Sequence, residues 1–184
     1  MVFGTLVEDR ELTQKLVEAV LEKEHAKIEE LFNSENKPNV DAEFNGMPLI
    51  IYAAQKKDWQ TVNILYDNFA NLDAKIELSN WHLIHECVLN APDNVFNALI
   101  QYCDLNVRDR YGKTPLMVLI EEGKLDRAEK LLKQGISVAI TDKNNENAGH
   151  YAARKNAYDI LLSLGEKKLP FNQLNKSNES VLDL

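Results

Sequence analysis

One segment of this chain recurs at an interval of 33 residues, and this repetition limits the possible folds more than any other feature. The clearest copy, residues 109–116, reads Asp-Arg-Tyr-Gly-Lys-Thr-Pro-Leu. A unit of this length has room for two short helices but cannot bury its own apolar face, so successive copies must stack to form a core. Further copies in the same register lie at residues 142–153, 46–54 and 83–88.

Each conspicuous residue of the clearest copy has a physical role at its position. Asp109 and Gly112 favour a tight turn, because aspartate accepts hydrogen bonds from the backbone two residues on and glycine tolerates a positive φ. Thr114 is a preferred N-cap, and Pro115 suits the first position of a helix. Gly135 suits the end of the second helix. The pattern therefore predicts a turn, a helix, a second helix and a stop.

This pattern resembles the ankyrin repeat, whose core runs approximately D-x-x-G-x-T-P-L-H-x-A-A-x-x-G. The resemblance implies an all-α solenoid of stacked helix–turn–helix units with hairpin-like turns. It also implies that His85 and His150, which occupy the histidine position of the repeat, bind neighbouring turns by hydrogen bonds. The expected organisation is an N-terminal helical cap at 1–39, units at 40–74, 75–106, 107–139 and 140–174, and the start of a further repeat or a C-terminal cap at 175–184.

Several positions depart from the pattern. The first unit has Phe69 where a glycine is usual, and the second has Trp81, His82 and Leu83 in place of x-Thr-Pro. The second unit also lacks one residue near Cys103 and has Pro92 between its helices. The fourth unit is predicted to be about three residues short before the pair Leu161–Leu162.

The chain contains few candidates for chemistry. His82, His85 and Glu86 lie close together, but their spacing differs from H-E-x-x-H, and the repeat already accounts for His85. Cys87 lies two residues from His85, so on a helix the two cannot form a nucleophile–base pair. Phosphate-binding and nucleophile-elbow motifs are also missing from the sequence. We therefore predict no catalytic residue, no cofactor and no metal.

Composition limits the cellular compartment and the classes of partner that we expect for this protein. The formal charge of −8 disfavours nucleic acid and anionic membranes, and no apolar run approaches the length of a membrane span. Cys87 and Cys103 form no C-x-x-C pair, which favours reduced thiols and a cytoplasmic location. The first ten residues lack the features of a signal peptide. A monomer is expected.

The repeat leaves the solvent-exposed surface unexplained. In proteins with this repeat, the turn tips and the exposed side of the first helix line a concave groove that binds partners. Aromatic residues at turn tips, where solvent is expected, are typical interface anchors, although Trp81 at its irregular turn has local packing as an equal alternative. The residues predicted to bind a partner are Phe44, Met47, Leu78, Trp81, Arg110, Tyr111, Lys113, Glu121, Glu122, Lys143 and Arg154.

The sequence therefore predicts a non-enzymatic protein–protein interaction module. Glu121 and Glu122 favour a partner with a basic patch, chiefly through the rate of association. Two alternatives stay open: the targeting part of a longer enzyme or effector with a catalytic domain beyond residue 184, and an immunity-type inhibitor that neutralises a toxin. A bacterial effector delivered into a host cell is one setting for such a chain.

Overall fold

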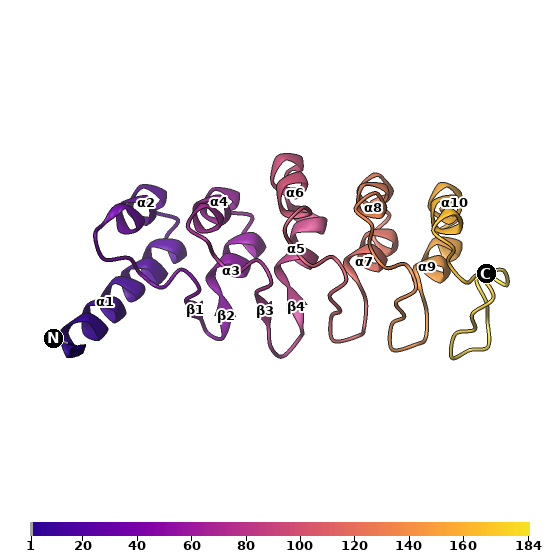
Figure 1. The fold of residues 1–184 in the computed structure, drawn as a ribbon, viewed down its shortest axis with the longest axis horizontal. Helices are drawn as coiled ribbons and strands as arrows, with labels where there is room; N and C mark the ends of the chain where they lie inside the picture. The colour runs from indigo at the N-terminus through magenta and orange to yellow at the C-terminus, as the bar shows by residue number, and fades with distance from the viewer. Residues whose placement is uncertain (1) are drawn as a thin grey trace.

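The computed structural model describes residues 2–184, with side chains from residue 10 onward. Within that range ten helices form five consecutive pairs in one row (Figure 1). This arrangement confirms the predicted stack of helix–turn–helix units. The pairs are α1 (Val2–Leu21) with α2 (His25–Asn33), α3 (Leu49–Gln55) with α4 (Trp59–Asp67), α5 (Leu83–Asn90) with α6 (Asp93–Leu99), α7 (Pro115–Glu121) with α8 (Leu125–Leu132), and α9 (Ala148–Arg154) with α10 (Tyr158–Glu166).

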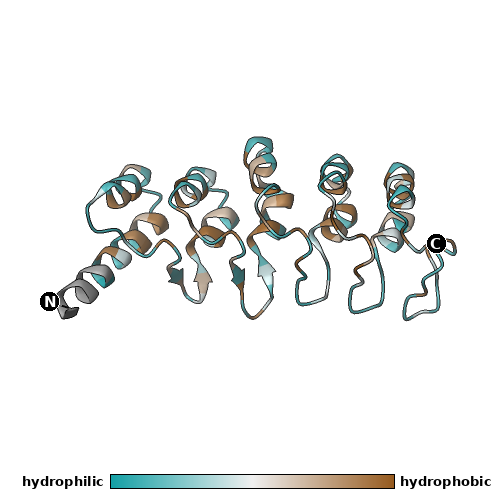
Figure 2. Ribbon diagram, viewed as in Figure 1, coloured by the Kyte–Doolittle hydropathy of each residue, from teal (hydrophilic) through white to brown (hydrophobic). Residues whose placement is uncertain are grey.

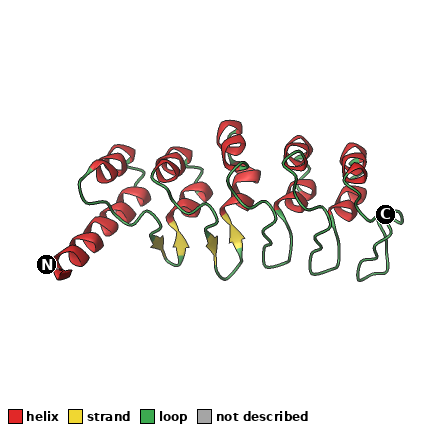
Figure 3. Cartoon of the chain, viewed as in Figure 1, coloured by secondary structure: helices red, strands yellow, loops and turns green. Residues whose placement is uncertain are grey.

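Five loops, here called fingers, project from the same side of the row; the first four precede α3, α5, α7 and α9, and the fifth follows α10 (Figure 3). They comprise residues 43–48, 75–82, 109–114, 142–147 and 175–180. The first finger pairs β1 (Glu43–Phe44) with β2 (Met47–Pro48), and the second pairs β3 (Lys75–Ile76) with β4 (Trp81–His82). The sequence predicted hairpin-like turns, and these two fingers contain short antiparallel strands.

The core runs between the two layers of helices along the whole row (Figure 2). Leu49, Leu83 and Leu116 open the inner helices α3, α5 and α7, and each is at most 2% exposed. Leu65 and Leu131, on the outer helices α4 and α8, are fully buried against them. Burying one such side chain contributes roughly 1.5–3 kcal/mol, so stacked units stabilise one another mainly through these layers.

In most units a left-handed residue joins the two helices. Lys57, Gly123 and Asn156 have φ values of 55°, 69° and 53° at equivalent positions. The second unit has Ala91 and Pro92 there instead, and Ala91 is extended with φ −66° and ψ 144°. A proline favours an extended residue before it, so this connection takes another path.

Arg127 of α8 caps the irregular end of α5. Its guanidinium donates to the carbonyl oxygens of Val88 at 2.9 Å and Ala91 at 2.6 Å, and to the Asp93 carboxylate at 2.9 Å. The guanidinium also lies 4.8 Å from the centre of the Phe96 ring. One side chain of the third unit thus satisfies carbonyls that are left open at the end of a helix in the second unit.

Side chains close the last three fingers. Asp109 accepts hydrogen bonds from the backbone amides of Tyr111 and Lys113, both at 2.8 Å. Asp142 and Asn175 make the same pair of contacts in the fourth and fifth fingers. The hydroxyl of Thr114 then caps α7 by accepting from the Met117 amide, as the sequence predicted.

Neighbouring fingers are hydrogen bonded from the second finger onward. The backbone amide of Arg110 donates to Ser79 O at 2.8 Å, and Lys143 N donates to Tyr111 O at 2.8 Å. Tip side chains add to these links: Asn80 donates to the carbonyl of Arg108, and the Arg108 guanidinium donates to Thr141 O at 2.7 Å. The last four fingers are therefore one connected edge and not four independent loops.

Gly112 is required by this connection. Its φ is 84°, and a Cβ placed on it would lie 2.8 Å from the Arg108 guanidinium and 3.0 Å from the backbone of Asp142. Gly46, at the tip of the first finger, also has a positive φ of 72° but meets nothing within 4 Å. Gly112 is thus needed both for its positive φ and for the close approach of its neighbours, whereas Gly46 is needed for its positive φ alone.

The predicted deletion in the fourth unit is wrong. Helix α10 begins at Tyr158, 33 residues after Leu125 begins α8, so the two helices are in register. Leu164 and Leu131 occupy equivalent positions, and both are fully buried. The pair Leu161–Leu162 imitated the repeat motif one turn too early, and Leu162 is in fact 69% exposed.

Both repeat histidines link neighbouring fingers, as the resemblance implied. In each, Nδ1 accepts from the backbone amide three residues earlier. His85 Nε2 lies 3.2 Å from Lys113 O, and His150 Nε2 lies 3.3 Å from Glu179 O. Burial lowers the pKa of His85 to about 4, so its ring is neutral at physiological pH.

Candidate functional site

A pocket of about 370 Å³ opens between the second and third fingers, and we call it the Trp81 pocket. It brings together three residues that the sequence predicted as partner contacts, namely Trp81, Arg110 and Tyr111. They come from β4 and from the tip of the third finger, which the hydrogen bond from Arg110 N to Ser79 O holds side by side. The pocket is lined by Gln55, Ile76, Ser79, Trp81, Glu86, Asp109, Arg110 and Tyr111.

Trp81 has both of the roles that the sequence left open. Its ring stacks on His85 with centroids 4.8 Å apart, and its indole N–H donates to the Glu86 carboxylate at 3.3 Å. The side chain is half-buried and also lines the pocket. It is therefore a packing residue that still presents part of its ring to solvent.

Tyr111 and Arg110 are exposed members of the pocket, as is Gln55. Tyr111 is 52% exposed, and the Arg110 guanidinium lies 4.7 Å from the centre of its ring. The Arg110 guanidinium also donates to the Tyr111 hydroxyl at 2.5 Å. Their backbones are fixed by Ser79 and Asp109, so the side chains are free to contact a partner without local unfolding.

Glu86 is a pocket residue that the partner-contact prediction missed. It is only 9% exposed, and its carboxylate accepts from the Trp81 indole and from the Asn90 amide at 2.6 Å. The sequence offered a signal, because Glu86 directly follows the repeat histidine at a position that holds Tyr52 and Tyr151 in the first and fourth units. In the sequence, Glu86 stands out only as a candidate metal ligand beside His82 and His85.

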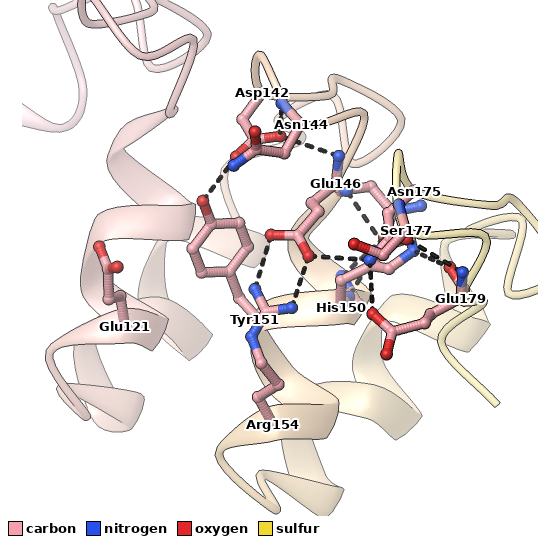
Figure 4. A network of polar contacts seen from close by, with 12 residues as sticks. Glu121, Asp142, Asn144, Glu146, His150, Tyr151, Arg154, Asn175, Ser177 and Glu179 are labelled. Atoms are coloured by element: carbon pink, nitrogen blue, oxygen red, sulfur yellow. Dashed lines mark hydrogen bonds and ion pairs between the residues drawn. The ribbon is translucent and has the colours of Figure 1, made fainter. Parts of the chain in front are cut away.

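Three of the predicted contacts in the third and fourth units, Lys113, Glu121 and Arg154, are ion-paired within the chain. The Lys113 ammonium lies 2.7 Å from the Glu121 carboxylate, so the two charges largely offset each other, and their contact with a partner stays a prediction. The fourth unit has the same pairing with the signs reversed, because Arg154 makes two hydrogen bonds of 2.6 and 2.7 Å to Glu146 (Figure 4). Both pairs join a finger to its inner helix.

Buried polar contacts strengthen the fourth finger (Figure 4). Burial opposes the charge on Glu146, but hydrogen bonds from Arg154 and Asn175 outweigh it and lower the pKa of its carboxyl group. The Tyr151 hydroxyl donates to Asp142 at 2.9 Å, and burial together with that carboxylate raises the pKa of Tyr151. The arrangement is a structural network, since every charge in it meets a partner inside the protein.

The other predicted contacts lie outside the Trp81 pocket. Phe44 and Met47 were expected to be exposed, but both are half-buried and pack against the core, with Phe44 in an edge-on contact with Tyr52 at 5.7 Å. The β1–β2 hairpin bends these side chains inward. Leu78 at the second fingertip is 96% exposed, and Glu122 and Lys143 are exposed too.

The cysteines that the sequence offered as candidate nucleophiles lie in the protein core. Cys87 and Cys103 are free and buried, and burial raises the pKa of Cys87 well above its ordinary value and that of Cys103 to about 12. A thiol with a raised pKa is a weak nucleophile at neutral pH. Across the described residues, no three His, Cys, Asp or Glu side chains are grouped to hold a metal ion. Nor does any described helix have both the length and the apolar character to cross a membrane.

Comparisons with known proteins agree with the geometry. A family model described as ankyrin repeats in three copies matches residues 84–175. The chain is 37% identical to inversin of Danio rerio over 73 residues, which is 39% of this chain and 7% of that protein. It is 36% identical to the inversins of Mus musculus and Homo sapiens over 103 residues, 55% of this chain and 10% of each. The matches therefore span no more than a tenth of these relatives.

Proposed function

The chain belongs to the ankyrin-repeat family, and from that premise we propose that it is a non-enzymatic module that binds another protein through its fingers and inner helices. Repeats of this family are in general protein–protein interaction modules. The Trp81 pocket is the proposed centre of the contact. We further propose that the protein acts as a monomer in the cytoplasm, and its two free thiols support a reducing compartment.

The single observation that carries this proposal is the grouping of Trp81, Arg110 and Tyr111 around one pocket. Tryptophan, tyrosine and arginine dominate the binding energy of protein interfaces, and they act best near the centre of a contact. Hydrogen bonds between fingers hold these residues in place before a partner arrives. A preorganised surface loses little conformational entropy on association, which favours affinity.

The experiment is selection of binders from a displayed library of random peptides and small domains, followed by quantitative binding. We expect the combination Arg110→Ala with Tyr111→Ala to weaken most selected binders at least tenfold, because both side chains are exposed and contribute little to folding. The matched control is Lys124→Ala with Lys133→Ala, on exposed positions around the outer helix α8. Binders that respond equally to both variants would refute the proposed surface.

A further inference from the structure

We propose that the Trp81 pocket receives a lysine or arginine side chain of the partner protein. This inference rests on the proposed function, since it assumes that a protein segment docks across the second and third fingers. It specifies the chemistry of the contact: a single cationic side chain that enters between Trp81 and Tyr111 and meets the carboxylate of Glu86.

The buried carboxylate of Glu86 favours a cation at this point of the pocket. Its carboxylate is almost fully buried, and its two donors, the Trp81 indole and the Asn90 amide, are uncharged. Glu121 and Glu146, which also adjoin the fingers, each have a basic partner within 2.7 Å, whereas no ion pair of Glu86 occurs among the described residues. A buried charge without a counter-ion is unfavourable, so a cation supplied by a partner is favoured at this point.

Asp109 provides a second carboxylate in the same lining. One of its oxygens accepts the two backbone amides of the third finger. In the fourth finger the other oxygen of the equivalent Asp142 accepts from the Tyr151 hydroxyl, but the third unit has Val118 at the place of Tyr151, and valine cannot donate. The lining therefore holds two carboxylates against one guanidinium, that of Arg110, which is engaged with Tyr111.

The walls of the pocket suit the rest of a basic side chain. The faces of tryptophan and tyrosine attract cations, and they also pack against the methylene stem of lysine or arginine. A volume of about 370 Å³ is at the lower end of the roughly 300–1,000 Å³ typical of ligand pockets, which suits one side chain and not a helix. An acidic side chain would be placed beside Glu86 and Asp109 and would be repelled.

The test uses the indole signals of the two tryptophans, Trp59 and Trp81, in proton–nitrogen correlation spectra of the full chain. The probes are acetylated, amidated tripeptides Gly-X-Gly in which X is lysine, arginine, norleucine or glutamate. We expect the lysine and arginine probes to shift the Trp81 signal in a saturable manner, while Trp59 on α4 stays unchanged. Norleucine has almost the shape of lysine without its charge and should shift Trp81 at least fivefold less at equal concentration.

Variants separate charge from shape. Glu86→Gln keeps the size of the side chain and should weaken the lysine and arginine probes at least fivefold, and Glu122→Gln, at an exposed position of the same face, should not. If Glu86→Gln proves unstable, Tyr111→Leu at the exposed rim tests the same contact and should weaken both probes. The inference is overturned if no probe shifts Trp81, if norleucine acts as strongly as lysine, or if these substitutions leave the cationic probes unaffected.

Failure of this inference differs from failure of the proposed function. Binders selected from the library that depend on Arg110 and Tyr111 but carry no common lysine or arginine would refute the cationic side chain and leave the binding surface intact. Selected binders that are insensitive to both residues would refute the surface itself. Binders that share a basic residue and lose affinity with Glu86→Gln would support both proposals.

Discussion

The first two fingers and the last three have similar outlines but are built by different chemistry. In the first two, short strands pair and aromatic rings pack: Phe44 against Tyr52, and Trp81 against His85. In the last three, a single polar side chain closes each loop by accepting two backbone amides. Ion pairs then join the third and fourth fingers to their inner helices, whereas the Lys75–Glu77 pair of the second finger, at 3.3 Å, stays within the finger.

The difference shows how one repeat produces unlike surfaces. Where an aspartate closes the loop, the charged groups at its base pair inside the protein, as Lys113 does with Glu121 and Glu146 with Arg154. Where paired strands and packed rings shape the finger, part of the Trp81 ring meets solvent and the carboxylate of Glu86 lies in the lining of the pocket. The Trp81 pocket lies at the boundary between the two kinds, with walls from the second and third fingers.

The largest expected effect comes from removing the closing side chain. Asp142→Ala takes away the acceptor of two backbone amides and of the Tyr151 hydroxyl in a buried site, which should reduce the free energy of unfolding by about 3–4 kcal/mol. Glu43 holds the equivalent position in the first finger, where it is exposed, and Glu43→Ala should cost under about 0.5 kcal/mol. Urea unfolding followed by circular dichroism compares them, and equal costs would contradict the distinction.

Acidification should lower the free energy of unfolding by about 2–3 kcal/mol through His85 in the second unit. The pKa of His85 is about 4 in the folded protein and near 6.5 when unfolded, so its contribution is complete above pH 6.5 and is lost as the pH falls toward 4. The third unit has Met117, which does not titrate, at the same position. His85→Met should therefore be less stable than the native chain at pH 7.5, and the gap should narrow by pH 4.5.

Comparing the two proteins by urea unfolding at each pH cancels the titration of every other group. A stability gap that stayed constant across this range would show that His85 is not buried in its neutral form.

A smaller effect, about 2 kcal/mol, should follow Gly112→Ala. The new methyl group adds a clash with Arg108 and with the backbone of the fourth finger to the strain of a positive φ. Gly46→Ala should cost only about 1 kcal/mol, because nothing lies near that tip. Thermal unfolding of the two variants measures the difference, and a larger cost at Gly46 would reverse the proposed order.

The sequence predicted much of the local structure because single positions determine it. The turn at Asp109 and Gly112, the cap at Thr114 and the links made by His85 and His150 each depend on one residue at a fixed place in the repeat. The register of the fourth unit was missed because a second leucine pair imitated the motif.

The pairing of charges could not be predicted in the same way. Lys113 and Glu121 are eight residues apart, one on a finger and one on a helix, and their contact depends on the angle between the two elements. The same holds for the contact of Arg154 with Glu146. It holds also for Glu86, which has no basic partner among the side chains that the structure describes.

Arg127 has a consequence for how the whole array unfolds. In a linear stack each unit contacts only its neighbours, so cooperativity depends on the coupling at every boundary, and a weak boundary divides the transition into two. The second unit is the natural breaking point, since it lacks a residue and the left-handed connection of the other units. Three hydrogen bonds from Arg127 cross from the third unit at this place and raise the coupling there. We therefore expect the two dissimilar halves to unfold in one cooperative transition.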